Sequence, residues 1–241
     1  MSQDQIFKEK FEKSTDFKFD AAVVNVFDDM VVRSVPYYLE IQRMMAELAG
    51  TYALPGTSLY DLGCSTGTTF LSMDSFIDPS VSFVGIDESV EMLESCRKNM
   101  DKHGLTRPIS LIEGDMNKKV NLENASVVVL CLSLQFIRPI NRQKLLQSIY
   151  KQMNHNGILI LVEKVIGETP EFNRTFIKYY YDMKRRNSYD DMEIAQKREA
   201  LENVLIPYKL SEDVEMLTEA GFHSCEVFFK WHNFAGMVAM K

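Results

Sequence analysis

Cysteine and histidine are scarce in this sequence, and neither follows a pattern that binds a metal or cross-links a fold. The four cysteines stand at positions 64, 96, 131 and 225, with no C-x-x-C pair and no even spacing. The four histidines show no H-x-x-x-H or mixed Cys/His spacing. Disulfide frameworks and metal sites need such patterns. We therefore expect no metal, and a protein of a reducing compartment, the cytoplasm.

A long apolar run and an excess of basic charge are also missing. The longest nearly apolar stretch, residues 125–137, is shorter than the ~20 residues of a membrane-spanning helix. The first 20 residues are too charged for a signal peptide. Asp and Glu number 34 against 27 Lys and Arg, a net charge of −7, whereas proteins that hold nucleic acid are usually basic. We expect neither a membrane nor nucleic acid as a direct partner.

The length of 241 residues and the ordinary hydrophobic share of 46% fit one domain over residues 1–241. Within it, residues 1–50 are expected to form an N-terminal helical cap. A helix should begin near Ser34, because Tyr38, Ile41 and Met45 then recur on one face.

Short apolar segments alternate with helical patterns along the rest of the chain. The predicted strands are 58–62, 81–86, 109–112, 126–132 and 158–162, the helices between them are 66–76, 89–100 and 141–153, and a turn follows at 154–157. Near-continuous apolar strands separated by helices are typical of a parallel sheet covered on both faces.

The alternation stops after the fifth strand, where residues 170–206 form two inserted helices. A helix at 211–220 then precedes two closely spaced strands, 225–231 and 235–240, which must pair antiparallel. The predicted fold class is α/β: the Rossmann-like sheet of class I S-adenosyl-L-methionine (SAM) methyltransferases, with a parallel core, an antiparallel C-terminal strand and a helical insertion.

A glycine-rich segment, residues 63–67 (GCSTG), follows the first predicted strand. Glycine allows a tight turn and the close approach of a ligand. Asp87 ends the second strand, where a carboxylate can accept ribose hydroxyls, and Asp115 ends the third. Because the carboxyl ends of parallel strands meet at one edge of a sheet, these groups predict an adenosine-shaped site.

Two other interpretations of this loop compete. Its G-x-S-x-G spacing matches the nucleophile elbow of hydrolases, with His223 or His232 as a nominal base, but acids at the next two strand ends are not that fold's arrangement. A dinucleotide enzyme would need G-x-G-x-x-G, whereas the spacing here is G-x-x-x-G. Cys64 is expected to be a small filling residue.

Arg198 stands in an otherwise apolar helical stripe with Ile194, Leu201 and Leu205. A guanidinium keeps its charge, so burial there would demand an anionic partner. That partner is either a protein carboxylate such as Glu202 or a ligand carboxylate, which arginine binds with two parallel hydrogen bonds.

Two further features carry both structural and functional interpretations. Tyr38 either packs in the core or presents its hydroxyl to a ligand. The run 184–186 (KRR) is expected to be a solvated helix face, and contact with tRNA is its functional alternative.

Several strings together resemble the carboxy-S-adenosyl-L-methionine synthases. They are 27–30 (FDDM), 33–38 (RSVPYY), 60–65 (YDLGCS), 112–115 (IEGD), 123–126 (ENAS), 134–136 (LQF), 163–164 (EK), 193–194 (EI), 196–198 (QKR), 201–204 (LENV), 220–222 (AGF) and 233–234 (NF). The resemblance runs from about residue 17 to the end and includes the inserted helices.

This resemblance implies a transferase that converts SAM and prephenate to carboxy-SAM and phenylpyruvate. The product would pass to a tRNA carboxymethyltransferase that modifies wobble uridine to 5-oxyacetyluridine. The family is homodimeric, and the helices at 170–206 are the expected interface. An ordinary SAM-dependent methyltransferase and a non-catalytic SAM-binding module remain alternatives.

The resemblance also implies site residues. The matching cofactor contacts are Tyr38, Gly63, Cys64, Ser65, Asp87, Glu88, Asp115, Met116 and Cys131. Arg198 matches the arginine that pairs with the carboxylate added to SAM, and it is the implied catalytic residue. One position departs, because Cys131 stands where the family commonly has Asn.

Overall fold

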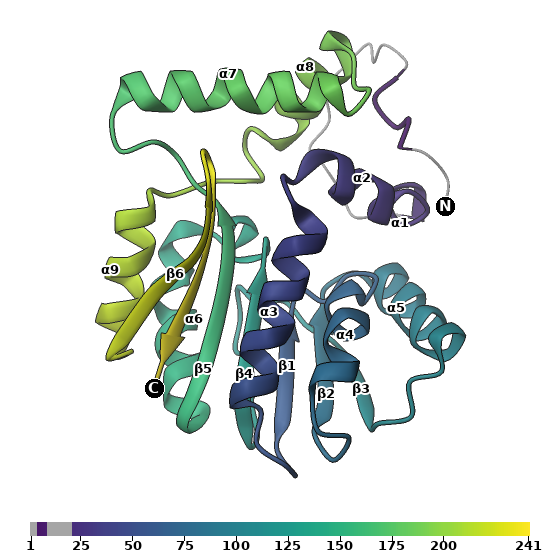
Figure 1. Ribbon diagram of the computed structural model, residues 1–241, viewed down its shortest axis with the longest axis vertical. Helices are drawn as coiled ribbons and strands as arrows, with labels where there is room; N and C mark the ends of the chain where they lie inside the picture. Colours follow the sequence, from purple (N-terminus) through teal and green to yellow (C-terminus); the bar gives the residue numbers. More distant parts are fainter. Residues whose placement is uncertain (1–3, 9–20) are drawn as a thin grey trace.

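The computed structural model describes residues 4–8 and 21–241, and one β-sheet organises them. The strands are β1 (Ser58–Leu62), β2 (Ser82–Asp87), β3 (Ile109–Glu113), β4 (Ala125–Cys131), β5 (Met153–Lys164), β6 (Ser224–Trp231) and β7 (Phe234–Met240). Their order across the sheet is β3-β2-β1-β4-β5-β7-β6 (Figure 1). The order turns back between β1 and β4, which is the point where doubly wound sheets place a ligand.

The strand directions confirm the predicted fold class. β1 to β5 pair in parallel, and β7 pairs antiparallel with β5 on one side and β6 on the other. The C-terminal strands pair antiparallel because only two residues separate them, too few for a crossover.

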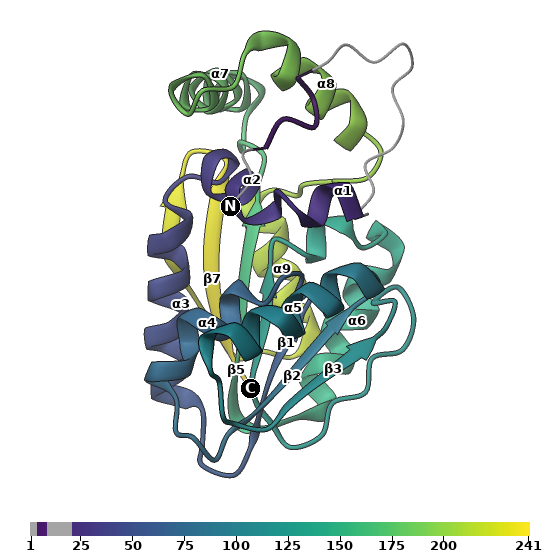
Figure 2. The ribbon, with the colours of Figure 1, turned by 90° about the vertical axis from the view of Figure 1, so that its right-hand side faces the viewer.

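Two layers of helices bury the faces of the sheet (Figure 2). The first contains α3 (Tyr38–Tyr52), α4 (Thr68–Met73), η1 (Asp74–Phe76) and α5 (Val90–His103); the second contains η2 (Leu134–Phe136), α6 (Pro139–Gln152) and α9 (Leu210–Ala220). In β4, Val127 and Val129 pack against the first layer, while Val128 and Leu130 pack against the second. A strand covered on both sides buries successive residues, which explains the apolar run from Val127 to Leu130.

A further group of helices lies above the carboxyl ends of the parallel strands (Figures 1 and 2). It consists of α1 (Ala21–Val24), α2 (Phe27–Ser34), α7 (Pro170–Arg186) and α8 (Asp191–Leu201). Residues 1–3 and 9–20 of the predicted N-terminal cap lie outside the described residues. None of the helices in residues 21–241 is long and apolar enough to cross a membrane.

The structure corrects two predicted element ends. Ser34 closes α2 instead of starting the next helix, and Tyr37, with a φ of 54°, turns the chain into α3. Residues 154–157 form a bulge inside β5 instead of a turn before it. Met153 pairs with Ala125 and Ile158 pairs with Val127, so residues 154–157 have no partner of their own on β4. They bulge out of the ladder, and Asn156 within the bulge has a φ of 61°.

Candidate functional site

A cavity of about 350 Å³ lies at the carboxyl edge of the sheet, between the strand ends and the helices above them. The predicted site residues that line it are Tyr38, Gly63, Cys64, Ser65, Asp87, Glu88, Asp115, Met116, Cys131 and Arg198. Its volume is within the range of small-molecule sites. The sequence predictions from four strand ends and two helices therefore meet at one place.

The glycine-rich loop after β1 contains several residues with a positive φ, a conformation that favours glycine. Gly63 has a φ of 86°, and a Cβ there would lie 2.6 Å from the Cβ of Ser133. Gly67 has a φ of 84°. Ser65, between them, also has a positive φ, 46°, which a serine adopts only at some cost. The loop thus presents bare backbone to the cavity, as close approach by a ligand requires.

Asp87 fastens this loop to the end of β2. Its carboxylate accepts hydrogen bonds from the backbone N–H of Ser65 at 2.9 Å and of Ser89 at 3.0 Å. Burial raises the pKa of Asp87, and the two amide donors partly offset that rise. Two carboxylate oxygens offer about four acceptor sites, so Asp87 retains capacity for ligand hydroxyls.

Glu88 and Asp115 make this end of the cavity acidic. Burial raises the pKa of Glu88, and repulsion from Asp115 and Asp87 raises it further. Asp115 accepts a hydrogen bond from the Asn117 backbone N–H at 2.8 Å, which is the main reason that its pKa is lowered. Acceptor-rich carboxylates suit the hydroxyl and amine donors of a nucleoside.

Tyr38 and Cys131 both line the cavity. Tyr38 is 8% exposed, and burial raises the pKa of its phenol well above the ordinary value. Burial also raises the pKa of the Cys131 thiol, so Cys131 is a neutral side chain here. The Nε2 of buried Gln42 lies 3.8 Å from the Cys131 sulfur. An amide thus stands behind the position where the resembling family commonly has Asn.

Helix α2 closes over the loop from above. The Asp28 carboxylate accepts hydrogen bonds from the hydroxyl of Thr66 at 2.6 Å and of Thr68 at 3.3 Å. Phe27, Met30 and Val31 of the same segment line the cavity. The N-terminal cap therefore forms part of the site.

Arg198 lines the cavity together with Ile194, Leu201 and Leu205, the three residues predicted to share its face. The expected burial of Arg198 was wrong, because its side chain is exposed at this edge. The alternative ion pair with Glu202 is also not among the contacts of the described residues. The neighbouring residue Lys197, 5% exposed, is the buried cation of this helix.

Three cavity lysines, one at the end of β5 and two in the inserted helices, escaped the sequence analysis. Lys164, Lys184 and Lys197 all line the cavity, and Lys184 is 5% exposed, so the prediction of a solvated 184–186 face was wrong for it. Arg185 and Arg186 are exposed as predicted. The missed signal was the helical spacing from buried Tyr180 to Lys184, which puts both on one face.

In residues 4–8 and 21–241, no three His, Cys, Asp or Glu side chains gather in a group that could hold a metal ion. The cavity lining includes acidic residues at the strand ends and basic residues of β5, α7 and α8, which we call its basic end.

Solved structures share this fold at low sequence identity. A SAM-dependent methyltransferase from Aquifex aeolicus aligns with a TM-score of 0.61 at 16% identity, over 92% of this chain and 99% of its own. A putative one from Methanococcus maripaludis gives a TM-score of 0.61 at 19% identity, over 96% and 97%. These similarities establish the class I fold.

Sequence relatives are much closer. Residues 59–157 match the family model described as a methyltransferase domain. The carboxy-S-adenosyl-L-methionine synthase of Methylococcus capsulatus is 53% identical over the full length of both chains. The protein of that name from Desulfotalea psychrophila is 42% identical over 94% of this chain and 92% of its own. This chain therefore belongs to the carboxy-S-adenosyl-L-methionine synthase family.

Proposed function

We propose that this protein is a transferase that carboxylates the methyl group of SAM, with prephenate as the carboxyl donor and phenylpyruvate as the second product. The observation that carries the proposal is the union of two features in one cavity. A nucleoside-type end is formed by the glycine loop, Asp87 and Glu88, and a permanent cation, Arg198, lines the same space. A methyl-transfer site needs the first feature, whereas a bound carboxylate needs the second.

The chemistry balances without an external oxidant or reductant. The sulfonium of SAM acidifies its methyl group, and loss of a proton leaves an ylide. Prephenate loses carbon dioxide and hydroxide as its ring becomes aromatic. The ylide carbon bonds to the carbon dioxide, and the hydroxide takes the methyl proton to form water.

The chain's own residues supply binding, orientation and exclusion of water. Asp87 and the loop backbone orient the nucleoside, and Arg198 pairs with the carboxylate as it forms on the methyl carbon. Tyr38 and the helix α2 cover the reacting centre, which limits quenching of the ylide by water.

The product is proposed to serve a tRNA carboxymethyltransferase that modifies wobble uridine. The net charge of −7 supports this proposal, because this protein would make only the small metabolite, and the tRNA carboxymethyltransferase would bind the tRNA.

Mass spectrometry of the nucleoside after incubation with SAM and prephenate tests the activity. A SAM species heavier by one carbon dioxide, with stoichiometric phenylpyruvate, is the expected result. Transfer of an unmodified methyl group without that species would identify an ordinary methyltransferase instead. SAM binding without any turnover of prephenate would identify a non-catalytic binding module.

A further inference from the structure

Three lysines from three separate elements converge on the basic end of the cavity. Lys164 ends β5, Lys184 lies in the last turn of α7, and Lys197 lies in α8. Lys184 and Lys197 are each 5% exposed. Burying an ammonium group without a partner costs free energy, so we expect anionic partners for these lysines.

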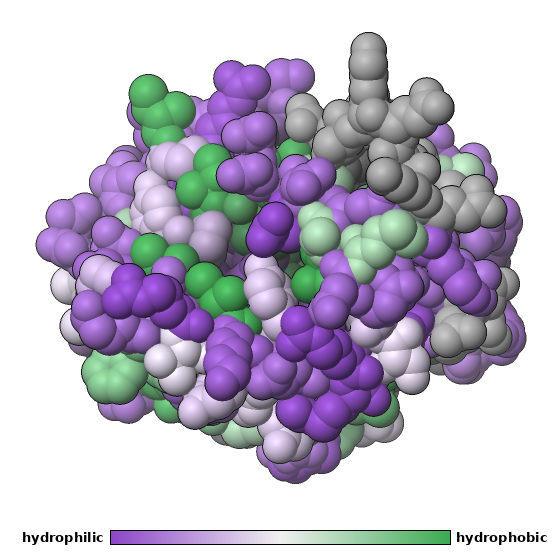
Figure 3. Space-filling model, turned by 90° about the horizontal axis from the view of Figure 1, so that it is seen from above, coloured by the Kyte–Doolittle hydropathy of each residue, from purple (hydrophilic) through white to green (hydrophobic). Residues whose placement is uncertain are grey.

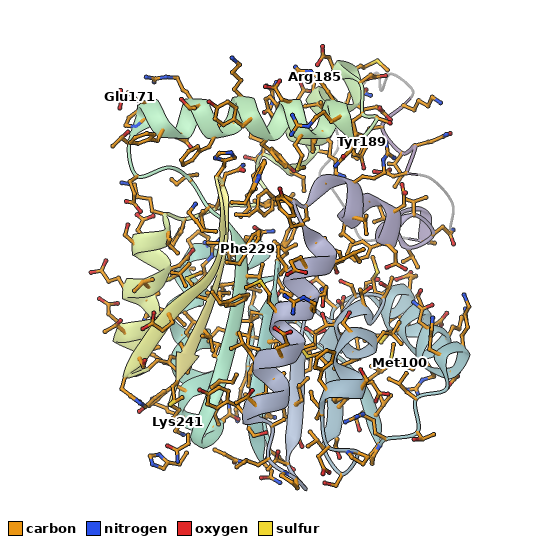
Figure 4. All side chains as sticks on the ribbon, viewed as in Figure 1. Met100, Glu171, Arg185, Tyr189, Phe229 and Lys241 are labelled. Carbon is orange, nitrogen blue, oxygen red and sulfur yellow. The ribbon has the colours of Figure 1, made fainter. Side chains whose placement is uncertain are left out.

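Two tyrosine rings connect the three ammonium groups. Lys164 Nζ and Lys184 Nζ lie 5.0 Å and 5.1 Å from the centre of the Tyr180 ring. Lys184 Nζ and Lys197 Nζ lie 5.6 Å and 5.4 Å from the centre of the Tyr189 ring. Figure 4 labels Tyr189, which lies between the α7 layer and α2 below it. The rings attract the cations but leave their charge uncompensated.

One carboxylate pairs with the cluster within the described residues. Asp4 Oδ2 lies 3.6 Å from Lys197 Nζ and accepts a hydrogen bond from the Tyr189 hydroxyl at 2.6 Å. Lys197 Nζ also donates to Ser34 Oγ at 3.1 Å. Lys164 and Lys184 form no ion pair with any residue that the structure describes. Arg33 and Glu193 also act on Lys197, but their opposite charges offset each other. With all three lysines protonated, as a bound anion would favour, one carboxylate would leave two positive charges unbalanced.

The acid beside Lys164 in the sequence does not compensate it. Glu163 and Lys164 are consecutive in a strand, so their side chains point to opposite faces. Glu163 accepts a hydrogen bond from the Leu134 backbone N–H on that other face. Burial and then repulsion from Asp213 raise its pKa well above the ordinary value, and Arg142 only partly offsets this rise.

The electrostatics of the cluster agree with this geometry. Burial lowers the pKa of Lys164 and of Lys197 to about 8, and Asp4 partly offsets the effect at Lys197. Burial, and then repulsion from Lys197 and Lys164, lowers the pKa of Lys184 well below its ordinary value. An anion beside them would favour their charged forms.

We propose that Lys164, Lys184 and Lys197 form an anion subsite that binds the two carboxylates of a dicarboxylate carboxyl donor. This inference rests on the proposed function, in which the second substrate carries two carboxylates next to the SAM methyl group. The lysines then determine specificity, because a monocarboxylate leaves one of the two excess charges unbalanced. The same chemistry could also bind the methionine carboxylate of SAM, and the experiment separates these two sources.

The first arm compares Lys184→Met and Lys164→Met with Lys144→Met, a control on α6 whose exposed lysine does not line the cavity. The expected result is a KM for prephenate raised at least tenfold in the two cavity variants, a Kd for SAM changed less than twofold, and no change in the control. An unaltered KM for prephenate would overturn the subsite. A Kd for SAM weakened as much as the KM for prephenate would assign the lysines to SAM instead.

The second arm measures binding without turnover. Calorimetry of prephenate with the protein loaded with S-adenosylhomocysteine should show binding to the wild type and at least tenfold weaker binding to Lys184→Met. If the wild type makes no carboxy-SAM, the proposed function fails, while lysine-dependent binding of prephenate still supports the subsite. No binding of prephenate to the folded wild type overturns the subsite. Should Lys184→Met unfold, Lys164→Met gives the same decision, because Lys164 is only partly buried.

Discussion

Arg198 and Lys197 are consecutive residues of α8, but one side chain is exposed and the other is buried. Lys197 is buried with Asp4, whereas Arg198 is exposed at the cavity edge and has no carboxylate partner among the described residues. A free guanidinium of this kind is available to a ligand carboxylate.

For Arg198→Leu we expect the affinity for carboxy-SAM to fall at least tenfold, about 1.4 kcal/mol, while the affinity for SAM changes little. The physical reason is that only carboxy-SAM carries the added carboxylate. Calorimetric titration with both ligands measures the difference, and Arg186→Leu, at an exposed position outside the cavity, is the control. An undiminished preference for carboxy-SAM would remove Arg198 from the site.

Asp61 is a buried carboxylate in β1, beneath the glycine loop. It is 1% exposed, its Oδ1 has no hydrogen-bond partner among the described residues, and burial raises its pKa from 3.8 to about 7. Between these two values the folded protein binds more protons than the unfolded chain, so stability falls as the pH rises through this window.

We therefore expect the free energy of unfolding of the wild type to fall relative to that of Asp61→Asn between about pH 4 and about pH 7, by on the order of 3 kcal/mol. Urea denaturation of both proteins across this range measures it. Stability curves that stay parallel would show that Asp61 is ionised in the folded protein.

At the scale of elements, the hydrogen bonds between Asp28 of α2 and the glycine loop connect the N-terminal cap to the site. Asp28 accepts from two loop hydroxyls, and hydrogen bonds to a charged group contribute about 1.5–3 kcal/mol when buried. Asp28 is half-buried, so we expect a contribution at the lower end of this range, about 1.5 kcal/mol.

For Asp28→Ala we expect SAM affinity to fall about tenfold, with faster amide exchange in α2 and in residues 63–68. Asp28→Asn keeps an acceptor oxygen and should restore most of the affinity. Titration calorimetry together with hydrogen–deuterium exchange tests this. Wild-type exchange rates in the alanine variant would show that α2 is held by its apolar contacts alone.

At the scale of the whole molecule, α7 carries exposed apolar side chains, and one of them, Tyr179, packs against His232 in the turn between β6 and β7. Phe172 is 59% exposed, Tyr179 42% and Ile177 37%. Figure 3 views this end from above and shows hydrophobic side chains gathered among hydrophilic ones. Apolar surface of this kind favours association, and we propose that α7 belongs to a homodimer interface.

We expect light scattering after gel filtration to give about twice the chain mass of 27.8 kDa for the wild type, and a shift toward the monomer for Phe172→Glu. A charge in a dimer interface loses hydration without gaining a partner. Ile140→Glu, at a 76% exposed position on α6, should leave the mass unchanged. The reverse pattern would move the interface to the α6 face.

The strands and the loop were predictable from the sequence because their causes are local. β1 has the predicted bounds. Most other strands extend past their predicted ends by backbone pairing, whereas β2 begins one residue later and β4 ends one residue earlier than predicted. β5 shows this most clearly: its polar residues 154–157 look like a turn, yet a bulge against β4 keeps them in the strand.

The sequence by itself determined the α/β order, the glycine turn and the acids at the strand ends, since period, turn chemistry and strand ends are properties of neighbouring residues. The tertiary structure alone decided which cations are buried. Lys164, Lys184 and Lys197 meet only because α7 and α8 fold back over the sheet edge, and the same folding leaves Arg198 exposed. Burial depends on what packs against a side chain from elsewhere in the chain, which no local pattern contains.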